Sequence, residues 1–137
     1  MEKNNKILIV DDDAFLLSMY EVKFKKAGFE VITSPGARDA LKKLEDGLTP
    51  DAITIDMVMP DMSGLEFLEE VKKNKYSPEA AIIVLSNQSQ TSDIHKAIEI
   101  GIDGYVVKAT TIPSEVVAEV EKIMKEKFGE KRASVAA

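Results

Sequence analysis

Short runs of apolar residues alternate with longer segments of helical periodicity along this chain. The apolar runs cover residues 7–10, 30–33, 52–55, 81–85 and 105–107, and most are nearly continuous in Ile, Val, Leu and Ala. Continuous runs of this kind are typical of strands that are buried on both faces, as in a parallel sheet. The pattern therefore predicts a parallel sheet of five strands.

Between these runs, apolar residues recur three and four positions apart, which predicts one amphipathic helix after each strand. Cap signals delimit the helices: Ser34-Pro35 suggests one helix start, and Ser63 with Glu66 has the spacing of a capping box. A β-α unit that occurs five times predicts a doubly wound α/β sheet with right-handed crossovers. We expect one domain over residues 1–128 and a frayed tail over residues 129–137.

Composition removes several classes of function. The chain has 137 residues and no cysteine, and His95 is its only histidine, so thiol chemistry and multi-histidine metal sites are excluded. The net charge of −6 argues against direct binding of nucleic acid by the whole chain. The sequence shows neither a membrane-spanning run nor a signal peptide, so we expect no membrane association and a cytoplasmic location.

Polar residues follow the predicted strands where each strand ends. Asp11-Asp12-Asp13 follow the first strand, Asp56 the third, Ser86 the fourth and Lys108 the fifth. In an open α/β sheet, ligands bind outside the carboxyl ends of the strands. We therefore expect these side chains to gather at one edge of the sheet.

Neighbouring carboxylates repel one another, which raises at least one pKa unless a cation is present. Asp11, Asp12 and Asp56 suit Mg²⁺, which binds through one or two carboxylates, waters and a phosphate. Ser86 adds a hydroxyl, and Lys108 adds an ammonium group that can pair with phosphate. This set of groups fits phosphoryl transfer, where positioning and charge neutralisation supply most of the catalysis.

Four motifs in this order resemble the receiver domain of two-component response regulators, in particular its stand-alone, chemotaxis-receiver-like form. They occupy residues 7–13, 51–64, 82–86 and 104–108, and the resemblance extends over residues 6–128. It implies a flavodoxin-like doubly wound α/β fold, with a five-stranded parallel sheet in the order 2-1-3-4-5 and five helices.

The resemblance also implies a role for each acid. Asp56 would accept a phosphoryl group from a histidine kinase or a phosphotransfer protein. Asp11 and Asp12 would bind Mg²⁺ together with Asp56 and the backbone carbonyl of Val58, with Asp12 as the favoured direct ligand of the acidic pair. The domain would catalyse only its own phosphorylation and dephosphorylation, so it would not be an enzyme in the ordinary sense.

The remaining roles concern the response to phosphorylation. Ser86 would be the switch hydroxyl that turns toward the phosphoryl group, Lys108 would pair with that group, and Tyr105 would be the switch aromatic. Together they would change the surface made by the fourth helix, the fifth strand and the fifth helix. An effector protein, which the sequence does not identify, would bind this surface.

Two features depart from the family pattern or affect its kinetics. Ala109 follows Lys108 where the family usually has proline, often after a cis peptide bond, and the sequence leaves a cis or a trans bond open. Val58 and Gln88 stand at the positions that influence dephosphorylation in the family. Because Val58 offers no group to orient water, we expect a phosphoryl group that persists for minutes or more.

Other interpretations use the same residues. Asp11-x-Asp13 could belong to a phosphatase of the haloacid dehalogenase type, although Phe15 and the lack of a cap domain argue against it. A flavin-binding electron carrier would need a phosphate cradle in place of the three acids. A degenerate receiver that acts only as a binding module conflicts with the intact Ser86 and Lys108. Asp13 alone is best interpreted as a helix cap.

Overall fold

Each predicted apolar run forms a strand, and a helix follows each strand. The computed structural model describes residues 5–87 and 91–136. Its elements are β1 (Lys6–Val10), α1 (Ala14–Lys26), β2 (Glu30–Ser34), α2 (Ala37–Glu45), β3 (Ala52–Asp56), α3 (Gly64–Lys73), β4 (Ala81–Ser86), α4 (Thr91–Ile100), β5 (Gly104–Val107), a 3-10 helix η1 (Lys108–Thr110) and α5 (Pro113–Ala136).

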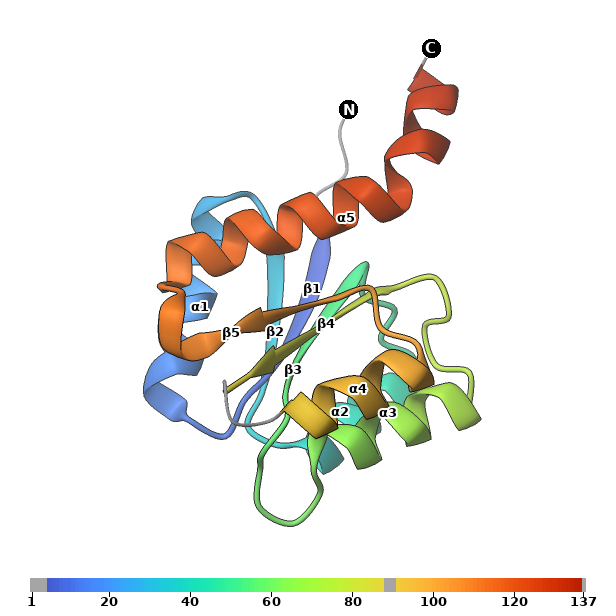
Figure 1. Ribbon diagram of the computed structural model, residues 1–137. Coiled ribbons are helices and arrows are strands. Elements are labelled where there is room, and N and C mark those ends of the chain that lie inside the picture. Colours follow the sequence, from blue (N-terminus) through green and yellow to red (C-terminus); the bar gives the residue numbers. More distant parts are fainter. Residues whose placement is uncertain (1–4, 88–90, 137) are drawn as a thin grey trace.

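The five strands form one parallel sheet in the order β2-β1-β3-β4-β5, which confirms the predicted topology (Figure 1). The register places Val10 opposite Ile55, and Asp56 opposite Leu85. The carboxyl ends of β1, β3 and β4 therefore meet at one edge of the sheet. The candidate site residues that the sequence predicts at the strand ends lie at this edge.

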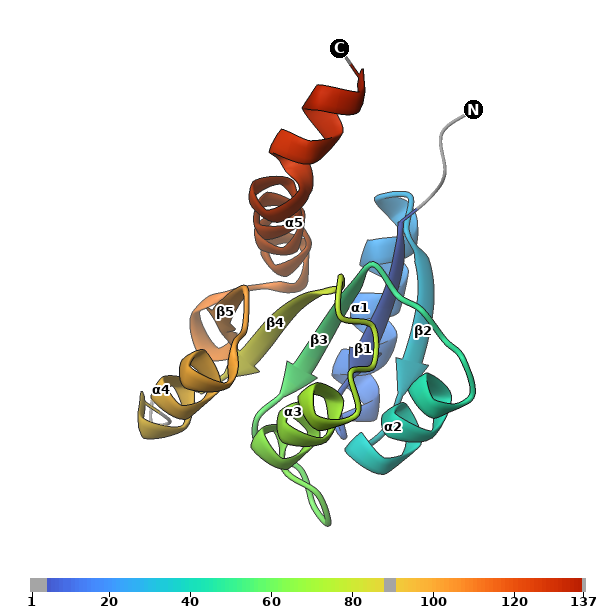
Figure 2. The same cartoon turned by 90° about the vertical axis from the view of Figure 1, so that its right-hand side faces the viewer.

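Helices cover both faces of the sheet (Figure 2). The helices α1 and α5 pack on the face that contains Ile7 and Ile9, whereas α2, α3 and α4 pack on the face that contains Leu8 and Val10. Neighbouring residues of one strand thus enter different cores, which is why the central strands are apolar at nearly every position. None of the described helices is long and apolar enough to cross a membrane.

Local signals explain most helix starts. Asp13 caps α1 by accepting hydrogen bonds from the backbone of the helix, and Ser63 forms the predicted capping box with Glu66. The start expected at Ser34-Pro35 is wrong: α2 begins at Ala37, after Gly36. Ser34 is instead the last residue of β2, where its carbonyl accepts a hydrogen bond of 3.2 Å from the backbone of Asp11.

The last helix continues past the body of the sheet (Figure 1). It begins at Pro113, as the sequence predicts, and extends to Ala136. The expected end of the domain near residue 128, with a frayed tail after it, stays a prediction.

Candidate functional site

The acidic residues of β1 and β3 meet at the carboxyl edge of the sheet. Asp11 follows β1 directly and is fully buried, and Asp56, the last residue of β3, is 7% exposed. Asp12 is exposed to solvent. Each of the three offers a carboxylate oxygen, and these oxygens all lie within 4.8 Å of one another. The expected gathering of the three acids is confirmed.

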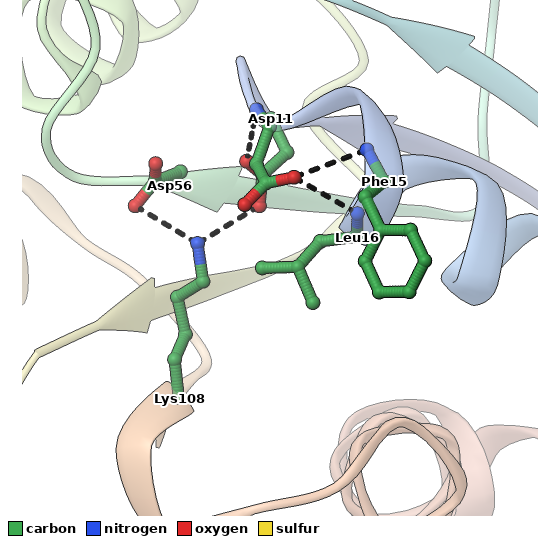
Figure 3. A network of polar contacts seen from close by, with 6 residues as sticks. Asp11, Phe15, Leu16, Asp56 and Lys108 are labelled. Atoms are coloured by element: carbon green, nitrogen blue, oxygen red, sulfur yellow. Dashed lines mark hydrogen bonds and ion pairs between the residues drawn. The ribbon is translucent and has the colours of Figure 1, made fainter.

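Lys108 reaches this cluster from the far end of the sequence (Figure 3). Its Nζ atom donates a hydrogen bond to Asp11 Oδ2 at 3.0 Å and lies 3.6 Å from Asp56 Oδ1. The turn of η1, which follows β5 directly, places the lysine side chain at the edge. Its ammonium group therefore neutralises part of the negative charge of two buried carboxylates.

Burial and charge shift the ionisation of the site. Burial raises the pKa of Asp56 from 3.8 to about 6; the Lys108 ammonium opposes this shift, and the carboxylates of Asp11 and Asp12 add to it. A hydrogen bond from the backbone of Val58 favours the charged form of Asp56 and lowers its pKa. For Lys108, burial alone would lower the pKa, but the hydrogen bond to Asp11 and the charge of Asp56 raise it overall. The lysine is therefore charged at neutral pH.

The donor set fits a hard divalent cation. Three carboxylates of different exposure supply oxygen ligands, which leaves coordination positions for water or a phosphate oxygen. One of them, Asp12, faces solvent, which gives an ion a route into the site. The expectation from the sequence that the Val58 backbone carbonyl is a further metal ligand stays a prediction. The Val58 side chain itself is 57% exposed.

Ser86 and Tyr105 lie on the neighbouring strands in different environments. Ser86 follows Leu85, the partner of Asp56 in the sheet, and its buried hydroxyl has no hydrogen-bond partner within the described part of the chain. Tyr105 on β5 is 48% exposed and lines a shallow groove between β5 and α5 that also includes Glu115 and Glu119. The serine is thus inside the site, while the tyrosine is on the surface.

Two further residues lie against the site, and neither turn chemistry nor helical periodicity reveals their roles there. Gly64 reads as ordinary turn chemistry, but a Cβ atom there would lie 2.6 Å from the backbone oxygen of Asp56 and 2.8 Å from Met57 Cα. Tyr20 of α1 is buried; burial raises the pKa of its phenol, and the charge of Lys108 opposes part of this shift. The Tyr20 phenol is therefore close enough to the Lys108 ammonium group for the two to interact electrostatically.

The two departures noted in the sequence have different outcomes. The described residues contain no cis peptide bond, and Lys108–Thr110 form the 3-10 helix η1. Gln88 lies outside the described residues, so its predicted influence on dephosphorylation stays a prediction. Asp13 uses its Oδ1 atom to accept hydrogen bonds from the backbone of Phe15 and Leu16 at 3.0 and 3.1 Å, which confirms its role as a helix cap.

Known proteins resemble this chain in both fold and sequence. The family model of the response regulator receiver domain matches residues 7–121 of this chain. The chain is 37% identical over 121 residues to the chemotaxis protein CheY of Thermotoga maritima, covering 88% of this chain and 98% of that protein. It is 31% identical to the alkaline phosphatase synthesis transcriptional regulatory protein PhoP of Bacillus subtilis, covering 89% of this chain but only 49% of that protein.

A solved structure gives the same result. The CheY-like response regulator receiver domain protein from Methanospirillum hungatei JF-1 superposes with a TM-score of 0.83 at 26% identity, covering 93% of this chain and 99% of that one. Fold and site thus define a doubly wound α/β signalling domain with an acidic centre at the carboxyl edge of its sheet. The chain belongs to the response regulator receiver domain family of two-component systems. The phosphatase and flavin-carrier interpretations are therefore wrong.

Proposed function

We propose that Asp56 accepts a phosphoryl group from a histidine kinase or a phosphotransfer protein in a reaction that depends on Mg²⁺. The observation that carries this proposal is the position of Asp56: it is nearly buried, in one carboxylate cluster with Asp11 and Asp12, and 3.6 Å from the Lys108 ammonium. A nucleophile, a cation and a set of metal ligands thus share one small volume at the edge of the sheet.

In the proposed reaction, an oxygen of Asp56 attacks the phosphorus of a phosphohistidine. The new P–O bond forms as the P–N bond breaks, and the bonding pair leaves with the imidazole, which takes a proton. Asp56 must be ionised to attack, which its pKa of about 6 allows at neutral pH. Lys108 holds its positive charge beside the reacting oxygen, where negative charge accumulates on the phosphoryl oxygens.

Mg²⁺, when bound by Asp11, Asp12, Asp56 and the Val58 carbonyl, would supply further neutralisation of the phosphoryl oxygens. In support of this arrangement, Asp11 is buried and both of its carboxylate oxygens are held by hydrogen bonds. Its Oδ1 atom accepts a hydrogen bond of 2.9 Å from the backbone of Asp13, and its Oδ2 atom accepts one from Lys108. Asp12 remains exposed and free to meet an incoming hydrated ion.

The response would begin at Ser86. Its buried hydroxyl lacks a partner in the described chain, and a phosphoryl oxygen on Asp56 would offer it an acceptor. Movement of Ser86 toward that oxygen would leave space for Tyr105 to turn inward from its exposed position. The surface of α4, β5 and α5 would then change between two states, and an effector protein that binds one state would stabilise it.

The proposal also covers the extent of the domain, its location and its activity. Residues 1–128 would form the receiver unit in the cytoplasm, with no direct contact to nucleic acid or membrane. The domain would catalyse only the gain and loss of its own phosphoryl group. The proposed output is therefore a change in protein binding.

Acetyl phosphate with MgCl₂ tests the proposal, with intact-mass spectrometry as the measurement. We expect the wild-type protein to gain the mass of one phosphoryl group, and Asp56→Asn or an excess of EDTA to prevent this. Asp46→Asn, which removes an exposed carboxylate at the end of α2, is the control for net charge and should be labelled normally. Full labelling of Asp56→Asn would refute the assignment of the phosphoacceptor.

A further inference from the structure

The loop of residues 57–63 between β3 and α3 carries Val58 and projects beyond the edge of the sheet (Figure 2). Backbone hydrogen bonds fix both of its ends. The Met57 amide donates to the carbonyl of Leu85 at 3.2 Å, and the Gly64 amide donates to the carbonyl of Met57 at 2.9 Å. The segment between these bonds includes Val58, whose backbone contacts the Asp56 carboxylate.

A side-chain ion pair holds the tip of this loop. Asp61 has a left-handed backbone, with φ of 71°, and its Oδ2 atom accepts a hydrogen bond from Nε of Arg38 in the first turn of α2. The two residues are 23 positions apart in the sequence, so the contact joins separate elements. Aspartate tolerates the left-handed region better than most residues do, so Asp61 can occupy this position of the turn.

We propose that Arg38 is a positioning residue for the Mg²⁺ side of the site. It acts through Asp61, whose ion pair with it restrains the loop so that the backbone of Val58 stays beside Asp56. This inference rests on the proposed function, because it assigns to Arg38 an effect on the metal that Asp56 would share.

Electrostatics alone predicts the opposite result for this arginine. Removing a positive charge from the protein would strengthen the binding of a divalent cation to the three carboxylates. Loss of the restraint on the loop would weaken it, because Val58 would no longer be held in place. Arg38→Ala therefore separates the two effects by the direction of the change.

The experiment is calorimetric titration of MgCl₂ into the wild type and three variants. Arg38→Ala should weaken Mg²⁺ binding by about twofold to fivefold, the range that an exposed ion pair can contribute. Arg38→Lys keeps a cation beside Asp61 and should bind like the wild type. Lys42→Ala is the matched control: it removes one positive charge and the 3.0 Å pair with Asp46 from the same helix, away from the loop.

Amide hydrogen exchange of residues 58–62 in the protein without metal provides a second readout. We expect faster exchange in Arg38→Ala and unchanged exchange in Lys42→Ala, because only the first releases the loop. Asp61→Asn breaks the same pair while keeping a residue that tolerates the left-handed backbone. It should reproduce the Arg38→Ala result and add nothing to it in the double variant.

The outcomes separate the two proposals. Mg²⁺ binding by Arg38→Ala that is as tight as, or tighter than, binding by Lys42→Ala overturns the role of Arg38 and leaves the proposed function standing. A wild-type protein that binds no Mg²⁺ refutes the proposed function and, with it, this inference. If Arg38→Ala does not fold, as judged by circular dichroism, Asp61→Asn decides the question against Asp46→Asn, which removes one exposed carboxylate away from the loop. Mg²⁺ binding by Asp61→Asn that is as tight as binding by Asp46→Asn then overturns the role of Arg38.

Discussion

Replacing Asp56 with asparagine should make the protein without metal more stable at neutral pH. The substitution keeps the size of the side chain and removes its charge. Burial raises the pKa of the Asp56 carboxyl from 3.8 to about 6, so ionising this group costs more in the folded protein than in the unfolded chain. Asparagine avoids that cost.

The shift in pKa sets the size and the pH range of the effect. Between the unfolded value of 3.8 and the folded value of about 6, the folded protein binds more protons than the unfolded chain, so wild-type stability falls as the pH rises through this interval. At about 1.4 kcal/mol per pH unit, the full loss is about 3 kcal/mol. Asp56→Asn should therefore exceed the wild type by up to about 3 kcal/mol above pH 6, and the difference should vanish below pH 4.

Urea unfolding in EDTA from pH 4 to pH 8 measures this difference. Asp39→Asn is a control of opposite sign, because the hydrogen bond from Lys43 lowers the pKa of Asp39. Its ionised form stabilises the fold above the unfolded pKa, and this stabilisation is lost as the pH falls through the folded pKa. The Asp39 variant should thus be slightly less stable than the wild type at neutral pH.

Two results would refute the reasoning about Asp56. The first is a variant no more stable than the wild type at pH 7.5, which would mean that Lys108 fully compensates the buried charge. The second is a stability difference that stays constant from pH 4 to pH 8, which would locate its cause in packing. Adding MgCl₂ should stabilise the wild type and leave Asp56→Asn nearly unchanged, since a ligand stabilises only the form that binds it.

Three further changes test the surroundings of Asp56. Lys108→Ala should destabilise the protein by about 3 kcal/mol at pH 7 in urea unfolding, because it leaves the buried Asp11 carboxylate without its 3.0 Å partner; unchanged stability would contradict this. Gly64→Ala should cost about 1–3 kcal/mol, because its Cβ would meet the backbone of Asp56 at 2.6 Å, and a thermal melt identical to that of the wild type would refute the clash. Val58→Asn should shorten the life of the phosphorylated protein, followed by the decay of its added mass, because it supplies a group that can orient water; a rapid decay that the variant leaves unchanged would contradict the prediction.

Much of this fold could be predicted from the sequence because its signals are local. The continuous apolar runs of β1, β3 and β4 indicate strands that are buried on both faces, and the structure places them at the centre of the sheet. Once the strands are known, the position of Asp11 and Asp56 follows, since parallel strands end at the same edge. The signal failed at Ser34, where pairing within the sheet took precedence over a capping preference.

The contacts that depend on distant side chains could not be predicted. Lys108 lies closer to Asp11 than to Asp56, with distances of 3.0 and 3.6 Å, and no pattern in the sequence ranks the two acids. The pair of Arg38 and Asp61 joins two surface segments, and neither residue stands out in its own segment. Such contacts depend on the path of loops, which apolar periodicity does not determine.

Several groups of the site lie in unfavourable surroundings, and the proposed reaction would relieve them together. Asp56 is a buried carboxylate with a raised pKa, and the Ser86 hydroxyl is buried without a partner in the described chain, a defect that costs about 1–3 kcal/mol. Lys108 is the nearby cation, but it donates its hydrogen bond to Asp11. A divalent cation would neutralise the acids, and a phosphoryl oxygen would accept a bond from Ser86. The free energy released by satisfying these groups would then favour the rearranged surface, which is how a small covalent change at Asp56 could alter the exposure of Tyr105 on a neighbouring element.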